Sequence, residues 1–223
     1  MRYIMNNCFD DTTELRQEII DICLKLNKLG LCIATWGNIS VRLRNCMLIT
    51  PSRMDYAAMR PEDMVAVALD DGRKLSGDRL PSSETALHGA LLNYRPDIAV
   101  LVHSHAPYAS ALACAHRALP VFVEDMAQII GAAVNCTAYV PGGRHQDLAE
   151  AACKVIGQTA MAVLLANHGV VVGGSSLQEA LTATLVLEKA AMIQINAGSD
   201  IKPIPEDQVT EERYRYLYKY GKE

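Results

Sequence analysis

Ala99-Val100-Leu101-Val102-His103-Ser104-His105 gives the clearest single indication of how this chain folds. The unbroken apolar run predicts a buried strand, and two histidines stand at its end. Successive side chains of a strand point to opposite faces, so both imidazoles can lie on one face. Two nitrogen ligands on one short element are half of a metal site of the kind that suits zinc and its first-row neighbours. An isolated H-x-H pair, however, commonly does no more than hydrogen-bond water or backbone.

A second apolar run, Ala162-Val163-Leu164-Leu165-Ala166, predicts another buried strand. It ends at Asn167-His168-Gly169, so a third imidazole occurs in the same context as the first two. A catalytic zinc usually takes three protein ligands and leaves one coordination position open. His168 is therefore the candidate for the third ligand.

The chain has 223 residues, of which 50% are apolar and 21% are charged, and we expect one domain over residues 1–223. With a formal net charge of -4 and no cluster of basic residues, it is not expected to bind nucleic acid. No apolar run approaches the roughly 20 residues of a membrane span, and the first residues do not resemble a signal peptide. We therefore expect a cytoplasmic protein without membrane association. The seven scattered cysteines are expected to be reduced thiols.

Helical and strand-like patterns are mixed along the rest of the chain without a strict β-α-β alternation. Asp11 and Glu14 are typical of a capping box, and apolar residues then recur at helical spacing until Gly30. A second helix is expected to begin within residues 81–84 and to end before Pro96. Further helices are expected over 107–114, 146–156, 176–197 and 206–223. Further strands are expected over 39–43, 47–50, 64–69, 121–123 and 137–140, with a hairpin turn at 70–72. Several short strands in succession favour antiparallel pairing, so we expect an α/β sandwich with a largely antiparallel sheet.

The segment Pro81-Ser82-Ser83-Glu84 is expected to open a helix with a serine as its N-cap. Glu84 then lies in the first turn, where a carboxylate can serve catalysis or simply favour the helix dipole. His88 lies one turn further on and is expected to pack or to hydrogen-bond. We exclude His88, His116 and His145 as metal ligands, the last two because they lie in polar, loop-like sequence.

Six motifs follow one another along the chain in an order that one known family shares. They are Gly37-Asn38-Ile39-Ser40, Leu48-Ile49-Thr50-Pro51-Ser52, Pro81-Ser82-Ser83-Glu84, His103-Ser104-His105, Asn167-His168-Gly169 and the terminal tyrosines Tyr214, Tyr216, Tyr218 and Tyr220. In these motifs essentially the whole chain resembles the class II aldolase and adducin family, and it is most similar to the branch that acts on L-fuculose 1-phosphate. The resemblance implies a three-layer α/β/α sandwich with a central, largely antiparallel mixed sheet. It also implies a homotetramer with active sites between subunits.

The same resemblance implies a metal site formed by His103, His105 and His168, which Glu84 joins in the substrate-free state. The implied metal is Zn²⁺, with Mn²⁺ or Co²⁺ as alternatives. Breaking a carbon–carbon bond beside a ketose carbonyl leaves an enediolate, and a zinc ion with three neutral ligands keeps its full positive charge to stabilise it. By resemblance, Glu84 then acts as general base and acid at the carbon that becomes nucleophilic. We therefore expect a metal-dependent aldolase that cleaves a ketose 1-phosphate of the L-fuculose 1-phosphate type to dihydroxyacetone phosphate and an aldehyde.

A sugar phosphate needs an anion site, and three loops offer hydroxyls, backbone amides and a helix N-terminus. They match the phosphate-binding positions of the family, which here are Gly37, Asn38, Thr50, Ser52, Ser82 and Ser83. Each loop taken alone is also explained by ordinary turn chemistry. Arg53 departs from the family pattern, because many relatives carry glycine after this T-P-S element. It either adds a phosphate contact or is a solvated surface residue.

The part of the active site that meets the aldehyde is less well defined by the sequence. A tyrosine stripe on a terminal helix is usually an interface or core face. By resemblance, however, Tyr220 is a catalytic candidate that reaches the active site of a neighbouring subunit. The fuculose branch carries another tyrosine a few residues after the position of Pro120, and this chain has none there. Either Glu124 or Asp125 takes over its role from an adjacent subunit, or the aldehyde differs.

Three other functions stay open on the sequence. A ribulose-5-phosphate 4-epimerase shares the metal site and the retro-aldol chemistry, but that branch typically has aspartate at the position of Glu84. A sugar-phosphate decarboxylase or dehydratase of the same family is also compatible with the motifs. A non-catalytic, adducin-like structural module would be expected to lose metal ligands, whereas all three histidines and the glutamate are present.

Overall fold

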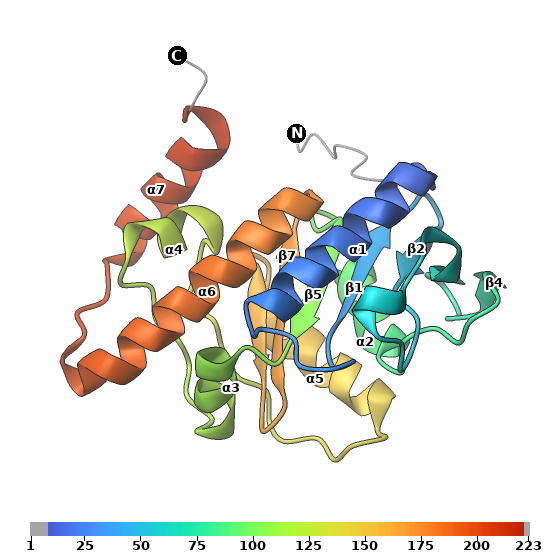
Figure 1. Cartoon of the computed structure of the whole chain (residues 1–223). Helices are drawn as coiled ribbons and strands as arrows, with labels where there is room; N and C mark the ends of the chain where they lie inside the picture. Colours follow the sequence, from blue (N-terminus) through green and yellow to red (C-terminus); the bar gives the residue numbers. More distant parts are fainter. Residues whose placement is uncertain (1–8, 221–223) are drawn as a thin grey trace.

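This computed structural model describes residues 9–220, in which seven strands form one sheet with antiparallel pairing between all neighbours (Figure 1). In order across the sheet, the strands are β4 (Lys74–Ser76), β3 (Val65–Ala68), β2 (Cys46–Ile49), β1 (Asn38–Arg42), β5 (Val100–Ser104), β7 (Gly169–Gly174) and β6 (Ala162–Leu165). The expected antiparallel sheet is confirmed, and β5 lies between β1 and β7. Residues 221–223, the end of the expected last helix, lie outside the described residues.

Helices cover both faces of the sheet and so complete three layers (Figure 1). One face carries α1 (Thr13–Lys28), α3 (Pro107–Cys114), α4 (Glu124–Ile129) and α6 (Leu177–Ala197), and α7 (Glu206–Tyr218) packs on α4. The other face carries α2 (Thr85–Tyr94) and α5 (His145–Ile156), which pack against each other. Short 3-10 helices span Tyr56–Ala58, Pro61–Asp63 and Gly198–Asp200. The expected three-layer α/β/α sandwich is therefore confirmed. No helix within the described part of the chain is long and apolar enough to cross a membrane.

The strand β5 belongs to two separate cores because its side chains alternate between the two faces. Val100 and Val102 pack with α1 and α6, whereas Leu101 packs with α2 and α5. Burial on both faces explains why this strand has an unbroken apolar run instead of an alternating pattern. His103 continues the alternation of Leu101, so its side chain lies on the face of the sheet where α2 begins.

The segment between α3 and β6 is less regular than the sequence predicts. The strands expected over 121–123 and 137–140 are wrong, because single bridges join Leu119 to Val134 and Cys136 to Leu164 instead of a ladder. The backbone of these segments finds scattered partners, such as Val121 O, which accepts the backbone N–H of Ile204 at 2.8 Å. The isolated bridge between Cys136 and Leu164 is parallel, whereas all strand pairs of the sheet itself are antiparallel.

The strand β7 lies between β5 and the edge strand β6, although its sequence did not lead us to expect it. Three valines are enclosed by Gly169, Gly173 and Gly174, and glycine weakens a strand pattern. The structure gives a packing reason for these glycines. A Cβ added at Gly173 would lie 2.7 Å from Cδ1 of Ile98, and one at Gly174 would lie 2.4 Å from the backbone nitrogen of Ala180. Neighbouring elements therefore approach β7 too closely for side chains at these positions.

Two helices begin later than the sequence predicts. Thr12 caps α1 in place of Asp11. The helix α2 begins at Thr85, so Glu84 occupies the N-cap position instead of the first turn, and its side chain makes no capping hydrogen bond. The hydroxyl of Ser82 accepts the backbone N–H of Glu84 at 3.2 Å instead. The carboxylate of Glu84 is thus available for contacts outside the helix.

Candidate metal centre

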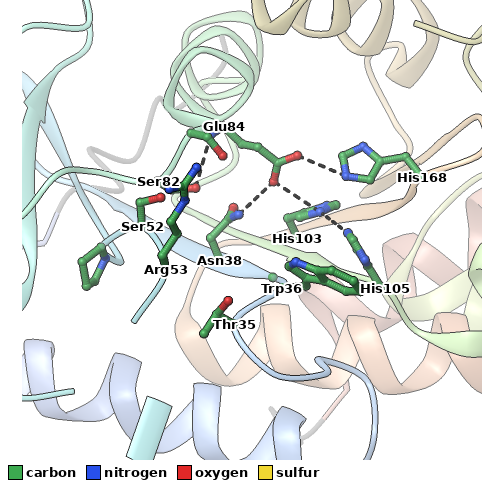
Figure 2. Close-up of a pocket in the computed structure, with 13 residues that line it drawn as sticks. Thr35, Trp36, Asn38, Ser52, Arg53, Ser82, Glu84, His103, His105 and His168 are labelled. Carbon is green, nitrogen blue, oxygen red and sulfur yellow. Dashed lines mark hydrogen bonds and ion pairs between the residues drawn. The ribbon is translucent and has the colours of Figure 1, made fainter. Parts of the chain in front are cut away.

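A cleft of about 330 Å³ opens at the end of β5, where three separate parts of the chain meet (Figure 2). His103 is in β5, and its antiparallel partner Asn38 begins β1 on one side. On the other side, the tight turn between β6 and β7 carries His168. The start of α2 brings Glu84 to the same place from the face of the sheet. Antiparallel pairing therefore brings Asn38, His103 and His168 together, and the start of α2 adds Glu84 to the same cleft.

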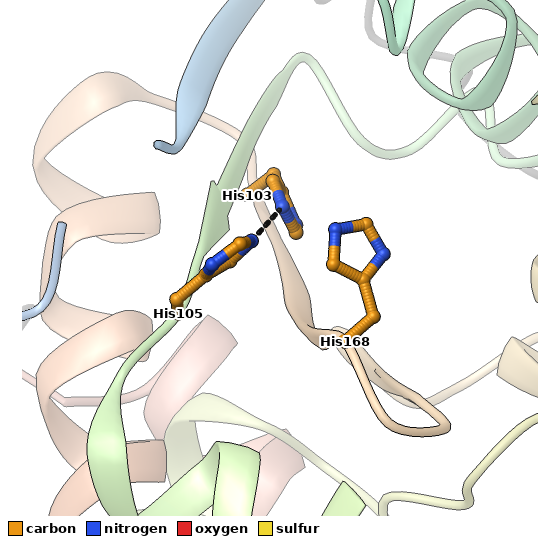
Figure 3. Close-up of side chains that lie close together, drawn as sticks. All are labelled: His103, His105 and His168. Atoms are coloured by element: carbon orange, nitrogen blue, oxygen red, sulfur yellow. Dashed lines mark hydrogen bonds between the residues drawn. The ribbon is translucent and has the colours of Figure 1, made fainter. Parts of the chain in front are cut away.

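The three histidines singled out from the sequence come together in this cleft (Figure 3). Their ligand atoms all lie within 4.8 Å of one another, and Nε2 of His103 lies 3.0 Å from Nε2 of His105. His103 is buried, whereas His105 and His168 are half-buried and so accessible from the cleft. A group of three imidazoles with one open side could hold a divalent metal.

The hydrogen bonds of His103 decide which of its nitrogens can bind a metal. Its Nδ1 lies 3.1 Å from the carbonyl oxygen of Val170. A carbonyl can only accept, so Nδ1–H donates and a neutral ring keeps its lone pair on Nε2. That lone pair faces the carboxylate of Glu84, whose Oε2 is 3.2 Å away. A cation between these electron-rich atoms would make the contacts attractive, so the residues present fit a divalent metal.

Glu84 contacts two of the three histidines. Its Oε1 lies 3.3 Å from Nε2 of His168, and its Oε2 accepts a hydrogen bond from Nδ2 of Asn38 at 2.8 Å. Burial alone would raise the pKa of Glu84, but the positive charges that His103, His168 and His88 carry when protonated, together with the hydrogen bond from Asn38, outweigh it and lower that pKa to about 2. The carboxylate is therefore charged at neutral pH and beside the imidazoles.

The protonation states of the half-buried histidines also suit metal binding. Burial, together with the neighbouring imidazoles of His103 and His168, lowers the pKa of His105 to about 4. Burial likewise lowers the pKa of His168. Both rings are then neutral at physiological pH, which is the form of imidazole that binds a metal.

The backbone conformation and close packing of the turn explain why asparagine and glycine stand on either side of His168. Asn167 has a φ of 57°, in the left-handed region that asparagine tolerates, and its Oδ1 accepts Nε2–H of His116 at 2.7 Å. A Cβ added at Gly169 would lie 2.5 Å from the carbonyl oxygen of Ser104 and 2.9 Å from Cδ2 of His105. The N-H-G motif thus allows β7 to pass close beside the other ligands.

The other two histidines outside the ligand set have different surroundings. His88 is fully buried, as expected, with its Nδ1 2.6 Å from the hydroxyl of Ser40. Burial lowers the pKa of His88 to about 3. His145 begins α5 and lines a second cleft of about 340 Å³. This second cleft meets the first at Ser83, Glu84 and His168.

Five of the six residues matched to phosphate-binding positions line the first cleft; they are Gly37, Asn38, Ser52, Ser82 and Ser83. Thr50 is buried and does not line it, because its hydroxyl accepts the backbone N–H of Ile39 at 3.2 Å. Trp36 also lines the cleft, with its ring 6.0 Å from that of His105, and 63% of it is exposed. Trp36 directly precedes Gly37 and Asn38, which the sequence motifs included, but those motifs did not include the indole.

The residues proposed for the aldehyde side do not line either cleft within one chain. Tyr220 is 76% exposed and stacks on Tyr216 with ring centroids 6.3 Å apart. Glu124 begins α4, and Asp125 pairs with Lys189. The sequence also missed Tyr139 and Arg144, which line the second cleft; the Gly142-Gly143 pair before α5 marked this loop.

Comparison with known proteins identifies the family. The model for the class II aldolase and adducin N-terminal domain matches residues 17–195. A 5-deoxy-D-ribulose 1-phosphate aldolase from Bacillus thuringiensis serovar kurstaki is 37% identical over 198 residues, covering 87% of this chain and 91% of the relative. An L-fuculose phosphate aldolase from Haemophilus influenzae is 33% identical over 200 residues, covering 88% of this chain and 90% of the relative. A solved structure of L-fuculose 1-phosphate aldolase matches with a TM-score of 0.86 and 31% identity, covering 93% of this chain and 98% of the solved chain.

Fold, site and relatives together define a class II aldolase, an enzyme that breaks carbon–carbon bonds and whose three histidines could hold a divalent metal. The chain belongs to the class II aldolase and adducin family. The family resemblance in its sequence motifs is thereby confirmed.

Proposed function

We propose that this protein cleaves a ketose 1-phosphate, of the L-fuculose 1-phosphate type, to dihydroxyacetone phosphate and an aldehyde. The observation that carries the proposal is the meeting of His103, His105, His168 and Glu84 in one cleft whose remaining wall is rich in serine. The relatives named for sugar-phosphate cleavage support the same substrate class. A reducing cytoplasm suits the free cysteines of the described chain.

His103, His105 and His168 would hold the metal, for which we propose Zn²⁺, with Mn²⁺ or Co²⁺ as alternatives. When bound, the ion supplies positive charge that stabilises the negative charge of the enediolate. The second nitrogen of His103 donates to Val170 O and so keeps Nε2 directed at the ion's position. Neutral rings at these positions leave the charge of the ion undiminished.

Glu84 is proposed as the group that moves a proton at the nucleophilic carbon. In cleavage, the C4 hydroxyl gives up its proton to the ionised carboxylate of Glu84 as the C3–C4 bond breaks, and the electron pair of that bond remains on the C3 side. Glu84 then delivers a proton to C3, and in the reverse direction it removes one. Its carboxylate is ionised, lies beside the imidazoles and is not used to cap α2.

The phosphate is proposed to bind between the loops that carry Gly37 and Asn38, Ser52, and Ser82 and Ser83. Ser82 and Ser83 precede α2, where a helix N-terminus favours an anion. Thr50 is proposed to position this site indirectly. Its hydroxyl accepts the backbone N–H of Ile39, which directly follows Asn38. Tyr220 is proposed to hydrogen-bond the C4 hydroxyl from a neighbouring chain of a homotetramer, since it is exposed and lines neither cleft of its own chain.

A second candidate substrate is a 5-deoxypentulose 1-phosphate. It is favoured by the relative from Bacillus thuringiensis named for 5-deoxy-D-ribulose 1-phosphate, at 37% identity against 33% for the fuculose phosphate aldolase from Haemophilus influenzae. Cleavage between C3 and C4 would then release a two-carbon aldehyde in place of a three-carbon hydroxyaldehyde. The absence of the fuculose-branch tyrosine after Pro120 agrees with a different aldehyde half.

The test is incubation of the metal-loaded protein with both ketose 1-phosphates and with ribulose 5-phosphate. Release of dihydroxyacetone phosphate is followed through its reduction by a coupled dehydrogenase, and sugar epimers are separated by chromatography. We expect release from a ketose 1-phosphate that stops when a chelator removes the metal and returns when zinc is restored. Formation of a C4 epimer without dihydroxyacetone phosphate would replace the proposal with an epimerase function.

A further inference from the structure

Arg53 lines the first cleft and is the one arginine or lysine among the described residues that do so. Its guanidinium has no hydrogen bond or ion pair to the described part of the chain. Other cleft residues are already engaged, since Asn38 binds Glu84 and the hydroxyl of Ser82 accepts the backbone of Glu84. Arg53 is therefore a free cation in a cleft that must receive an anionic substrate.

The backbone holds Arg53 at this position in a conformation that arginine does not favour. Its φ is 57°, in the left-handed region where glycine is the residue without a steric penalty. The loop is tied to the Ser82 loop by two bonds, from Ser52 N to Leu80 O at 2.9 Å and from Ser82 N to Thr50 O at 3.1 Å. A strained residue that is fixed in place by its surroundings at the mouth of a cleft is typical of a functional position.

Among the described residues, the end of the cleft opposite the three histidines has no positively charged side chain other than that of Arg53. Figure 2 shows Arg53, Ser52 and Ser82 on the other side of the cleft from His105 and His168. The serines offer hydroxyls but no charge, and Glu84 adds a negative charge. A phosphate ester carries about -1.5 to -2 charges at pH 7. The planar guanidinium can bind two of its oxygens at once.

We propose that Arg53 is a phosphate-binding residue of this enzyme, and that it supplies the positive charge of the substrate's phosphate site. The inference rests on the proposed function in so far as the phosphate is that of a ketose 1-phosphate. Ser52 and Ser82 hydrogen-bond the same phosphate, and Arg53 selects the dianion over an uncharged sugar. Because Arg53 is exposed, its contribution falls as the salt concentration rises.

The experiment measures binding of inorganic phosphate to the full chain by calorimetry at low and high salt. Arg53→Asn removes the charge and keeps a residue that tolerates the left-handed region, and Arg53→Gly also relieves the strain. We expect both variants to bind phosphate about tenfold more weakly at low salt, with most of the salt dependence gone. Arg60→Gln is the matched control, because Arg60 lies on the same segment with a side chain 77% exposed outside the cleft. It should bind phosphate as the unmodified protein does.

A melting temperature separates this role from a structural one. Arg53→Gly should melt at the same or a higher temperature while phosphate binding weakens, whereas a structural role would lower both. In cleavage assays, KM for the ketose 1-phosphate should rise about tenfold in both variants while kcat changes little. Because the phosphate titration needs no turnover, weaker binding in both variants supports Arg53 even if no ketose phosphate is cleaved.

Two results would overturn the role of Arg53. One is a phosphate affinity in both Arg53 variants that equals that of the unmodified protein; failure of the unmodified protein to bind phosphate would have the same meaning. The other is an equal loss in Arg60→Gln, which would mean that overall charge acts and not a contact. If dihydroxyacetone phosphate is released with an unchanged KM in the Arg53 variants, the proposed function stands and the inference about Arg53 fails.

Discussion

Gly169 lies where β7 passes close beside His103 and His105, and its replacement by alanine tests this packing. The added Cβ would be 2.5 Å from the carbonyl oxygen of Ser104, 2.9 Å from Cδ2 of His105 and 3.3 Å from Cε1 of His103. Two of these atoms belong to ligand rings and the nearest belongs to the backbone of β5. No side-chain rotation can relieve the nearest contact, so β5 and β7 must move apart.

The expected effect has two parts, one on stability and one on metal affinity. Overpacking of a buried site costs about 1–3 kcal/mol in the free energy of unfolding. For a domain of this size each kcal/mol lowers the melting temperature by about 2–4 °C. Displacing the His105 ring should also weaken zinc binding by about tenfold or more, because ligand geometry must be held closely. Urea unfolding of the metal-free chain and zinc titration with a chromophoric chelator measure the two parts separately.

Gly89→Ala is the matched control because it adds the same methyl group to α2. Its Cβ would meet only the end of the flexible Met47 side chain, at 3.8 Å. Alanine is preferred to glycine inside a helix by about 0.5–1 kcal/mol, so this variant should be equally or more stable and bind zinc normally. The reasoning about Gly169 is refuted if Gly169→Ala matches the unmodified protein in both unfolding and zinc affinity.

Two further predictions concern the histidines. His103→Ala should lose bound metal, measured by elemental analysis of the purified protein, together with aldolase activity; full metal content and activity in this variant would remove His103 from the site. Burial holds the pKa of His88 at about 3 against 6.5 in the unfolded chain, so the unfolded state takes up a proton first as the pH falls. The free energy of unfolding of the metal-free chain, measured by urea titration, should therefore decline as the pH falls from about 6.5 to about 3. The decline should be less steep in His88→Asn. An equal decline in the two proteins would contradict a neutral, buried His88.

Several parts of this fold could be predicted from the sequence because a single local rule decides them. The helix α1 shows helical spacing, α6 begins with the capping residues Ser176 and Glu179, and β5 shows the unbroken apolar run of a strand buried on both faces. The histidines could be grouped because each follows such a run, and antiparallel neighbours bring their ends to one edge. Local pattern and tertiary packing agree at these positions.

Other parts depend on contacts that no local pattern contains. Residues 121–123 have the apolar, β-branched composition of a strand, but the backbone of Val121 bonds to Ile204 from a distant linker. In β7 the glycines obscure the strand pattern, whereas close approach by Ile98 and Ala180 requires two of them, Gly173 and Gly174. Thr50 matched a ligand-binding position, yet its hydroxyl is used by the neighbouring strand. The second cleft could not be predicted because α5, the loop before it and the His168 turn meet only in the folded chain.

The hydrogen bond between His103 and Val170 makes the chemistry of one metal ligand depend on the alignment of two strands. β5 and β7 pair with Ser104 opposite Val170, and this register places the accepting carbonyl beside Nδ1. A slip of one residue would turn every side chain of β7 to the other face and carry the adjoining His168 out of place. Only chains with the correct strand pairing can therefore bind the metal tightly. Metal loading consequently distinguishes correctly folded molecules from misregistered ones, and substitutions in β7 that touch no ligand can still alter metal affinity.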